Sequence, residues 1–167
     1  MNSSKEFENI VKDILNNKEF IKLKNIKHHG ISRYEHSLSV AKKSYKMFKN
    51  LNLDYVCATR AALLHDFFHV EHDKNFISRM KYFFIHPSLS KENSTSHYNL
   101  TKKQINIIES HMFPTSIKLP KSKEAIVVCL IDKLVALNDF LTKFSFSTRK
   151  VYNGVFIATI FTVVKSI

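Results

Sequence analysis

Glycine, proline and tryptophan are scarce in this chain of 167 residues, which contains two glycines, three prolines and no tryptophan. A glycine-rich loop that cradles phosphates needs several glycines close together, and a β-sandwich needs many turns built from glycine and proline. The composition therefore argues against both. Hydrophobic residues make up 44% and charged residues 24% of the chain, which is the balance of a globular protein rather than of a disordered one.

Cysteine is equally rare. The two cysteines, Cys57 and Cys129, lie in apolar stretches and cannot build a disulfide framework, so they are typical of buried thiols in a reducing compartment. The N-terminal segment does not have the basic and then apolar layout of a secretory signal peptide. The apolar tail, 151–167, is shorter than the roughly 20 residues that a membrane span needs. We therefore expect a cytoplasmic protein without a transmembrane segment.

Acidic residues are few, since 26 lysines and arginines face 14 acids and give a net charge of +12. Such an excess is compatible with a polyanionic partner or with solvated lysines on helix faces. The lysines are scattered and form no run of about five like charges, the kind that marks a binding tail. We therefore interpret them as surface lysines and do not expect a nucleic-acid partner.

Helical periodicity is the pattern that the chain does contain. Apolar residues recur at helical spacing, and Ser32, Asp54 and Thr101 are well placed to cap helix starts. The length suits one domain. We predict a single all-α domain over 1–167, a helical bundle, with a C-terminal packing segment at 143–167. The predicted helices are 4–17, 33–49, 55–68, 75–85, a helix that begins at Pro87, a helix capped by Thr101 that runs to His111, 122–141 and 151–167.

Three of these helices each place a metal-ligand side chain in an apolar setting. His36 lies in one helix, the adjacent pair His65 and Asp66 ends the next, and Asp132 interrupts the apolar run VVCLIDKLVAL. An isolated carboxylate on a buried helix face is costly unless it is paired or bound to a cation. Mixed imidazole and carboxylate ligands are typical of hydrolytic metal centres.

The order His, His-Asp, Asp resembles that of the HD-domain metal-dependent phosphohydrolases. The segments that carry the resemblance are RYEHSLSVA around His36, AALLHDFFH around His65 and Asp66, and CLIDKLVAL around Asp132. The resemblance covers roughly residues 28–142. It implies a helical bundle of the HD type and a first metal held by these four side chains.

Two further histidines fit the six-ligand members of that superfamily. His86 and His111 lie between the His-Asp pair and the last aspartate. By resemblance they would complete a second metal site, and Asp66 would bridge the two ions; helix-cap or surface positions are the alternative. The expected cofactor is one or two divalent transition ions (Fe, Mn, Zn, Co or Ni), with Mg less suited to the imidazole ligands.

Three residues are predicted to take part in catalysis. Asp66 would orient the attacking water as well as bridge the metals. Arg33, one turn before His36, would form a fork of hydrogen bonds with a phosphate, and Lys133 would add a positive charge beside the metals or pair with an acid.

The predicted function is metal-dependent hydrolysis of a phosphate ester or anhydride in a nucleotide or similar small phosphorylated metabolite. One alternative within that class is a dinucleoside-polyphosphate hydrolase. An alternative outside it is a non-catalytic HD module that binds nucleotide or nucleic acid through its basic surface. The sequence leaves the substrate, the identity and number of the metal ions, and the oligomeric state open, a homodimer included.

Overall fold

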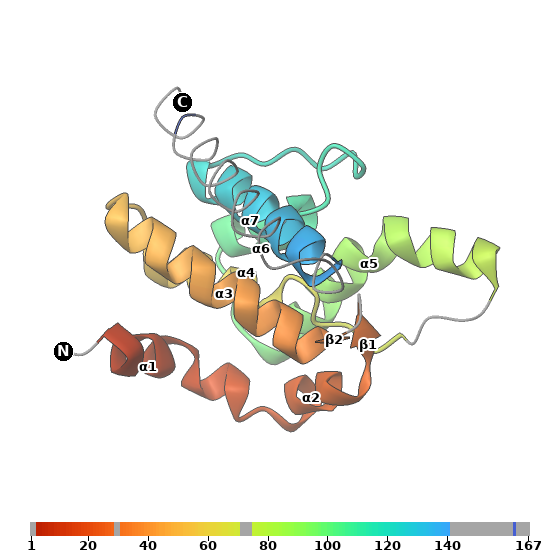
Figure 1. The fold of residues 1–167 in the computed structure, drawn as a ribbon, viewed down its shortest axis with the longest axis horizontal. Helices are drawn as coiled ribbons and strands as arrows, with labels where there is room; N and C mark the ends of the chain where they lie inside the picture. The colour runs from red at the N-terminus through yellow and green to blue at the C-terminus, as the bar shows by residue number, and fades with distance from the viewer. Residues whose placement is uncertain (1–2, 29–30, 71–74, 141–161, 163–167) are drawn as a thin grey trace.

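The computed structural model describes residues 3–28, 31–70, 75–140 and Thr162. Helices dominate these residues, as predicted for an all-α domain, and one short antiparallel hairpin is added to them (Figure 1). The hairpin pairs Lys27 with Ser32 and His28 with Ile31. The elements in chain order are α1 (Ser3–Leu15), α2 (Lys18–Ile21), the 3-10 helix η1 (Lys22–Asn25), β1 (Lys27–His28), β2 (Ile31–Ser32), α3 (Arg33–Asn50), α4 (Tyr55–Leu64), α5 (Phe76–His97), α6 (Lys102–Ser110) and α7 (Lys123–Phe140).

The centre of the bundle is the pair α3 and α4, which α1, α6 and α7 surround. Helix α4 presents the small residues Ala58, Ala61 and Ala62 to its neighbours, and all three are completely buried. Small side chains let the neighbouring helices approach closely, so this helix can be apolar on most sides. Helix α1 packs against α4 and contributes an apolar stripe to the same core (Phe7, Val11 and Ile14).

The predicted capping residues are confirmed. Ser32 begins α3 by accepting from the backbone N–H of Glu35, whose carboxylate accepts in return from the N–H of Ser32. Thr101 and Gln104 form the same reciprocal arrangement at α6, and Asp54 caps α4. Each cap satisfies N–H groups that the first turn of a helix leaves without a partner.

The predicted break before Pro87 is wrong, because α5 runs without interruption from Phe76 to His97 and contains Pro87 in its interior. Proline lacks the N–H that would bond to the carbonyl four residues earlier, here that of Phe83. In α5 the imidazole of His86 takes that place, since its Nδ1 lies 2.9 Å from the oxygen of Phe83. The helix therefore continues past the proline without leaving this carbonyl unsatisfied.

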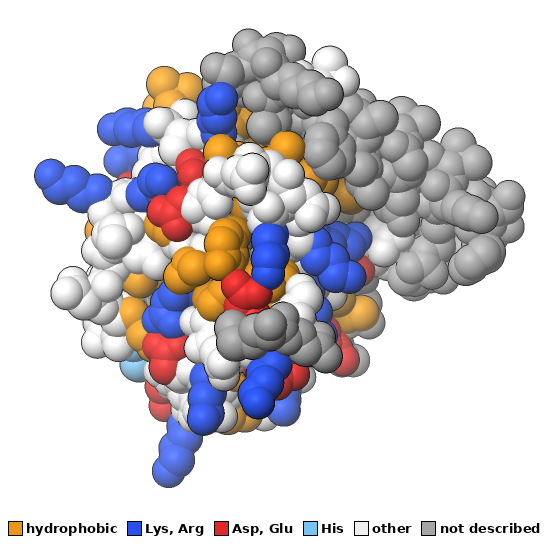
Figure 2. All heavy atoms as spheres, turned by 90° about the vertical axis from the view of Figure 1, so that its left-hand side faces the viewer, with side chains coloured by type: hydrophobic (Ala, Val, Ile, Leu, Met, Phe, Trp, Pro, Cys, Tyr) orange, Lys and Arg blue, Asp and Glu red, His pale blue; other side chains and the backbone are white. Residues whose placement is uncertain are grey.

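The sequence also led to predictions about the C-terminal segment, membrane spans and the charged surface. The C-terminal segment 143–167, apart from Thr162, lies outside the described residues, and with it the predicted packing helix 151–167. Among the described helices, none is long and apolar enough to cross a membrane. Figure 2 shows lysine and arginine side chains spread over one face of the molecule with acidic side chains among them.

Candidate metal centre

Five segments of the described structure bring six buried ligand-type side chains together. His36 lies on α3, His65 and Asp66 follow the last turn of α4, His86 lies on α5, His111 follows α6, and Asp132 lies on α7. Three overlapping groups of these residues have ligand atoms within 4.8 Å of one another. The six residues that the sequence singled out therefore meet at one place in the fold.

The first half of the cluster surrounds Asp132. Its Oδ1 lies 2.9 Å from Nε2 of His36 and 3.3 Å from Nε2 of His65. A second carboxylate, that of Asp66, also faces His65, and its Oδ2 lies 3.7 Å from Nε2 of His65. Two imidazoles and two carboxylates thus face one another in a buried space, which is a ligand set suited to a transition ion.

The second half of the cluster lies on the opposite side of Asp66. The Oδ1 atom of this aspartate lies 3.5 Å from Nε2 of His86 and 3.7 Å from Nε2 of His111. Its Oδ2 faces His65 in the first half. One carboxylate therefore presents a different oxygen to each half, which is the arrangement that a bridging ligand requires.

Backbone carbonyls fix the tautomers of three histidines. His65 Nδ1 lies 2.8 Å from the carbonyl oxygen of Ala62, and His111 Nδ1 lies 2.7 Å from that of Ile108. Because a carbonyl oxygen can only accept, each Nδ1 carries the proton. In the same way, Nδ1 of His86 donates to the carbonyl oxygen of Phe83. The Nε2 atoms of all three rings therefore point into the cluster. Ligating histidines in metalloproteins are oriented by contacts of this kind.

The pair His86 and His111 shows that the cluster fits a cation. Their Nε2 atoms lie 2.9 Å apart, although both rings carry their protons on Nδ1. Two bare lone pairs repel at that distance, so the arrangement calls for a positive charge between or beside them, either a proton or a metal ion. Burial, together with the neighbouring imidazoles of His65 and His86, lowers the pKa of His111 to about 3, which disfavours a proton on His111 itself.

His36 is held from both sides. Its Nε2 faces Asp132, and its Nδ1 lies 3.1 Å from Oδ2 of Asp139. Burial lowers the pKa of this imidazole, but the two carboxylates outweigh burial and raise the pKa to about 10. In the metal-free protein both nitrogens therefore carry protons, and a metal at Nε2 would replace one of them. Asp139 was not predicted from the sequence; its place seven residues after Asp132, on the same face of one helix, was the available signal.

Arg33 is completely buried and bound to the segment that follows Asp66. Its guanidinium donates to the carbonyl oxygen of Phe68 at 2.6 Å and lies over the phenyl ring of that residue, 3.6 Å from the centroid. A second, longer contact of 3.4 Å joins it to the carbonyl of Val70. The structure thus gives Arg33 an anchoring contact to the backbone, and the predicted hydrogen bond to a phosphate stays a prediction.

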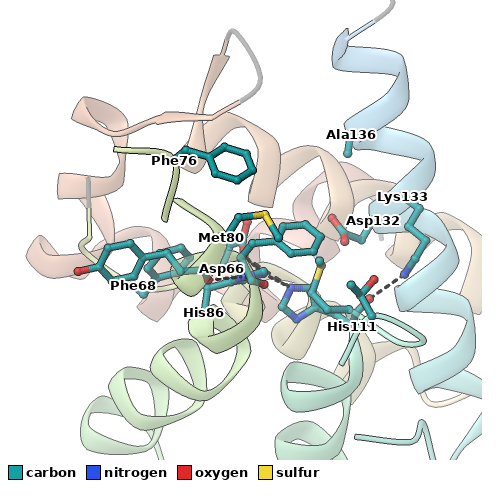
Figure 3. Close-up of a pocket in the computed structure, with 13 residues that line it drawn as sticks. Asp66, Phe68, Phe76, Met80, His86, His111, Asp132, Lys133 and Ala136 are labelled. Carbon is teal, nitrogen blue, oxygen red and sulfur yellow. Dashed lines mark hydrogen bonds and ion pairs between the residues drawn. The ribbon is translucent and has the colours of Figure 1, made fainter. Parts of the chain in front are cut away.

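Lys133 follows Asp132 on α7 and lies on the wall of a cavity beside the cluster. Its ammonium donates to the carbonyl oxygen of His111 at 3.0 Å (Figure 3). It also lies 2.9 Å from Sγ of Cys129. The residue therefore ties α7 to the turn that carries His111. The predicted acidic partner of Lys133 is not among the contacts of the described residues, and the role of Lys133 as a charge beside the metals stays a prediction.

A cavity of about 680 Å³ opens directly onto the cluster, with Asp66, His86, His111 and Asp132 in its lining. Figure 3 shows His111 and Asp66 between the wall formed by α5 and the wall formed by α7. Ligand pockets of roughly 300–1,000 Å³ hold molecules of the size of a cofactor or drug. These ligand-type side chains therefore lie where a molecule much larger than a phosphate ion can reach them.

Comparison with protein families places residues 33–137 in one model, that of the HD domain. The chain belongs to the HD-domain family. The match covers the helices from α3 to most of α7 and includes all six ligand-type residues, in the His, His-Asp, Asp order read from the sequence. Comparison with curated proteins and with solved structures gives no significant match. The HD family is typically one of metal-dependent phosphohydrolases, which agrees with the buried His and Asp cluster.

Proposed function

We propose that this HD-domain protein is a metal-dependent phosphohydrolase that cleaves a phosphate ester or anhydride of a small phosphorylated metabolite, nucleotides being the class predicted from the sequence. The observation that carries the proposal is the convergence of six buried ligand-type side chains beside one cavity, three of them with Nε2 directed inward by backbone carbonyls. A site built only for stability would have no need of such a cavity.

Two sets of residues would hold the ions. His36, His65, Asp66 and Asp132 form the first set, and Asp66 with His86 and His111 forms the second. A divalent transition ion bound there supplies a Lewis acid that neutralises phosphoryl oxygens and makes a bound water acidic. The imidazole-rich ligand set favours Fe, Mn, Zn, Co or Ni over Mg.

The residues of the chain would position the reactants. In hydrolysis the oxygen of water forms a bond to phosphorus, the bond from phosphorus to the leaving group breaks, and the leaving oxygen takes up a proton from the water. Asp66 faces both halves of the cluster, so its carboxylate is placed to orient that water and accept its proton. Lys133 holds His111 in place through its backbone and adds a positive charge to the cavity wall.

The decisive experiment measures metal and turnover together. Protein purified without chelator should retain metal by elemental analysis, and D66A should lose both metal and hydrolysis of the phosphorylated compounds tested. The matched control is E92Q, which changes an exposed carboxylate on α5 outside the cluster. Full activity of D66A would contradict the proposal. H86A tests the second set, because loss of its ligand should lower the metal content from two ions to one per chain.

The substrate panel separates the alternatives predicted from the sequence. Mononucleotides, dinucleoside polyphosphates, cyclic nucleotides and guanosine tetraphosphate should be offered to the metal-loaded protein under the same conditions. A preference for dinucleoside polyphosphates would select that alternative within the hydrolase class. Salt-sensitive binding of DNA or RNA without any metal-dependent hydrolysis would instead support the non-catalytic module.

A further inference from the structure

The cavity beside the metal cluster has a second half that is almost entirely apolar. Its described lining there comes from α5, from the segments after α4 and α6, and from α7. The apolar members are Phe68, Phe76, Met80, Phe83, Met112 and Ala136. Because these side chains share one cavity with Asp66 and His86, a molecule whose phosphate reaches the cluster places its remaining part against them.

The wall formed by α5 is exposed to an unusual degree for large apolar side chains. Phe76 is 72% exposed, Phe83 43% and Met80 41%, and their spacing of four and three residues puts them on one face of the helix. In Figure 3, Phe76 and Met80 lie across the cavity from Asp132 and Ala136 of α7. Contiguous exposed apolar surface beside a polar centre is typical of a binding groove.

Few polar groups in this half of the cavity could recognise a sugar, a base edge or further phosphates. Away from the six ligands, the described lining carries polar side chains on Tyr82, Thr115 and Lys133. The ammonium of Lys133 already donates to the carbonyl of His111. A cavity that selects for a polar substrate normally presents several fixed donors and acceptors, whereas an apolar wall selects by the apolar area it buries.

We propose that the apolar half of this cavity binds the leaving group of the substrate, and that the substrate is a phosphate ester of an apolar alcohol or phenol. The inference rests on the proposed phosphohydrolase function and narrows its substrate class. The phosphoryl group lies at the metal cluster, and the alkyl or aryl group packs against Phe76, Met80 and Phe83. Hydrolysis releases the free alcohol, which takes the proton from water, and inorganic phosphate.

The test is a series of primary alkyl phosphates, from ethyl to octyl, offered to the metal-loaded protein. The leaving alcohols of this series have nearly equal acidity, so differences in kcat/KM report burial of the chain and not reactivity. Each methylene that enters an apolar site changes affinity by about fourfold. We expect kcat/KM to rise by up to about that factor per carbon until the cavity is filled, and to exceed the value for any 5′-mononucleotide.

Two variants on α5 locate the effect. F76S should flatten the dependence of kcat/KM on chain length, so that the loss relative to the parent grows from ethyl to octyl phosphate. The matched control is I77S, since Ile77 is the next residue on the helix, is 75% exposed, and is not part of the cavity lining. Both positions are exposed, so neither substitution removes core packing. If kcat/KM rose equally with chain length in F76S and I77S, the assignment of the leaving group to this wall would be overturned.

Binding of alkylphosphonates, which cannot be hydrolysed, separates the two proposals. Calorimetry should show the same gain in affinity per methylene, reduced in F76S and retained in I77S. If affinity for the phosphonates rises with chain length but no ester is hydrolysed, the phosphohydrolase function is rejected and the apolar site is kept. Hydrolysis with no dependence on chain length, or a preference for nucleotides, would reject the apolar site and keep the function.

Discussion

The Nδ1 atom of His36 lies 3.1 Å from Oδ2 of Asp139, a residue two helical turns beyond Asp132 on α7. The carboxylate accepts the Nδ1 proton and so leaves Nε2 as the nitrogen that faces the cluster. A carboxylate in this position orients a ligating imidazole and raises its basicity, and its loss typically costs about 10–100-fold in metal affinity.

We therefore expect D139N to bind metal about 10–100-fold more weakly than the unmodified protein. Competition with a chromophoric chelator measures that affinity. The control is E92Q, which changes an exposed carboxylate outside the cluster and should leave the affinity unchanged. Unchanged metal affinity in D139N would show that the negative charge of Asp139 does not strengthen metal binding through His36.

Pro87 supports a second prediction, of opposite sign for stability and for metal binding. A proline inside a helix costs about 3 kcal/mol, so P87A should raise the free energy of unfolding by up to about that amount. The new N–H of residue 87 would also compete with His86 Nδ1 for the carbonyl of Phe83. We expect weaker binding of the metal that His86 holds, measured by titration of the metal-free protein. Tighter metal binding in P87A would contradict this role for the proline.

The parts of the fold that sequence reasoning predicted correctly depend on local chemistry. Ser32, Asp54 and Thr101 cap helices because a side-chain oxygen can reach an N–H two or three residues away, which needs no tertiary information. The convergence of His65 with Asp132 was predictable because a polar residue inside an apolar helix face must find a partner in the core.

Two features show what was not predicted from the sequence. One is an exception to a general rule about proline, and the other depends on a partner that is distant along the chain. The break predicted before Pro87 applied the rule for helix starts, whereas the side chain of His86 compensates for the missing N–H. The contact of Arg33 with the carbonyl of Phe68 joins a helix to a segment 35 residues away. Backbone carbonyls carry no signature in the sequence, so a phosphate was the partner that the side chain alone suggested.

Arg33 allows a direct test of its two roles. R33M removes the donors to the carbonyl of Phe68, and leaving a buried carbonyl without a partner costs about 1–3 kcal/mol, so the free energy of unfolding should fall by that amount. Urea denaturation measures it. The control is K46M, at an exposed position on the same helix. Its free energy of unfolding should stay within about 0.5 kcal/mol of that of the parent. Unchanged stability with a raised KM would instead support the phosphate-binding role.

The last prediction concerns pH and the hydrogen bonds that join Glu6 of α1 to α3 and α4. The carboxylate of Glu6 accepts hydrogen bonds from Lys49, Tyr55 and Tyr45, and these bonds, that of Lys49 first, lower the pKa of Glu6 from 4.5 to about 2. A carboxyl whose pKa is lower in the folded state than in the unfolded state stabilises the fold above its unfolded pKa. The contribution of Glu6 is therefore complete above about pH 4.5, and it is lost as the pH falls toward 2.

Urea denaturation between pH 2 and pH 6 tests this contribution through the difference between variant and parent. E6Q should be less stable than the parent at pH 6, and the difference should shrink as the pH falls, because the parent loses at low pH what the variant never had. The control E8Q changes an exposed carboxylate on the same helix, α1, and should follow the parent throughout. A constant gap between E6Q and the parent over the whole range would show that ionisation of Glu6 does not stabilise the fold, and that the hydrogen bonds from Tyr45 and Tyr55 persist with a neutral partner.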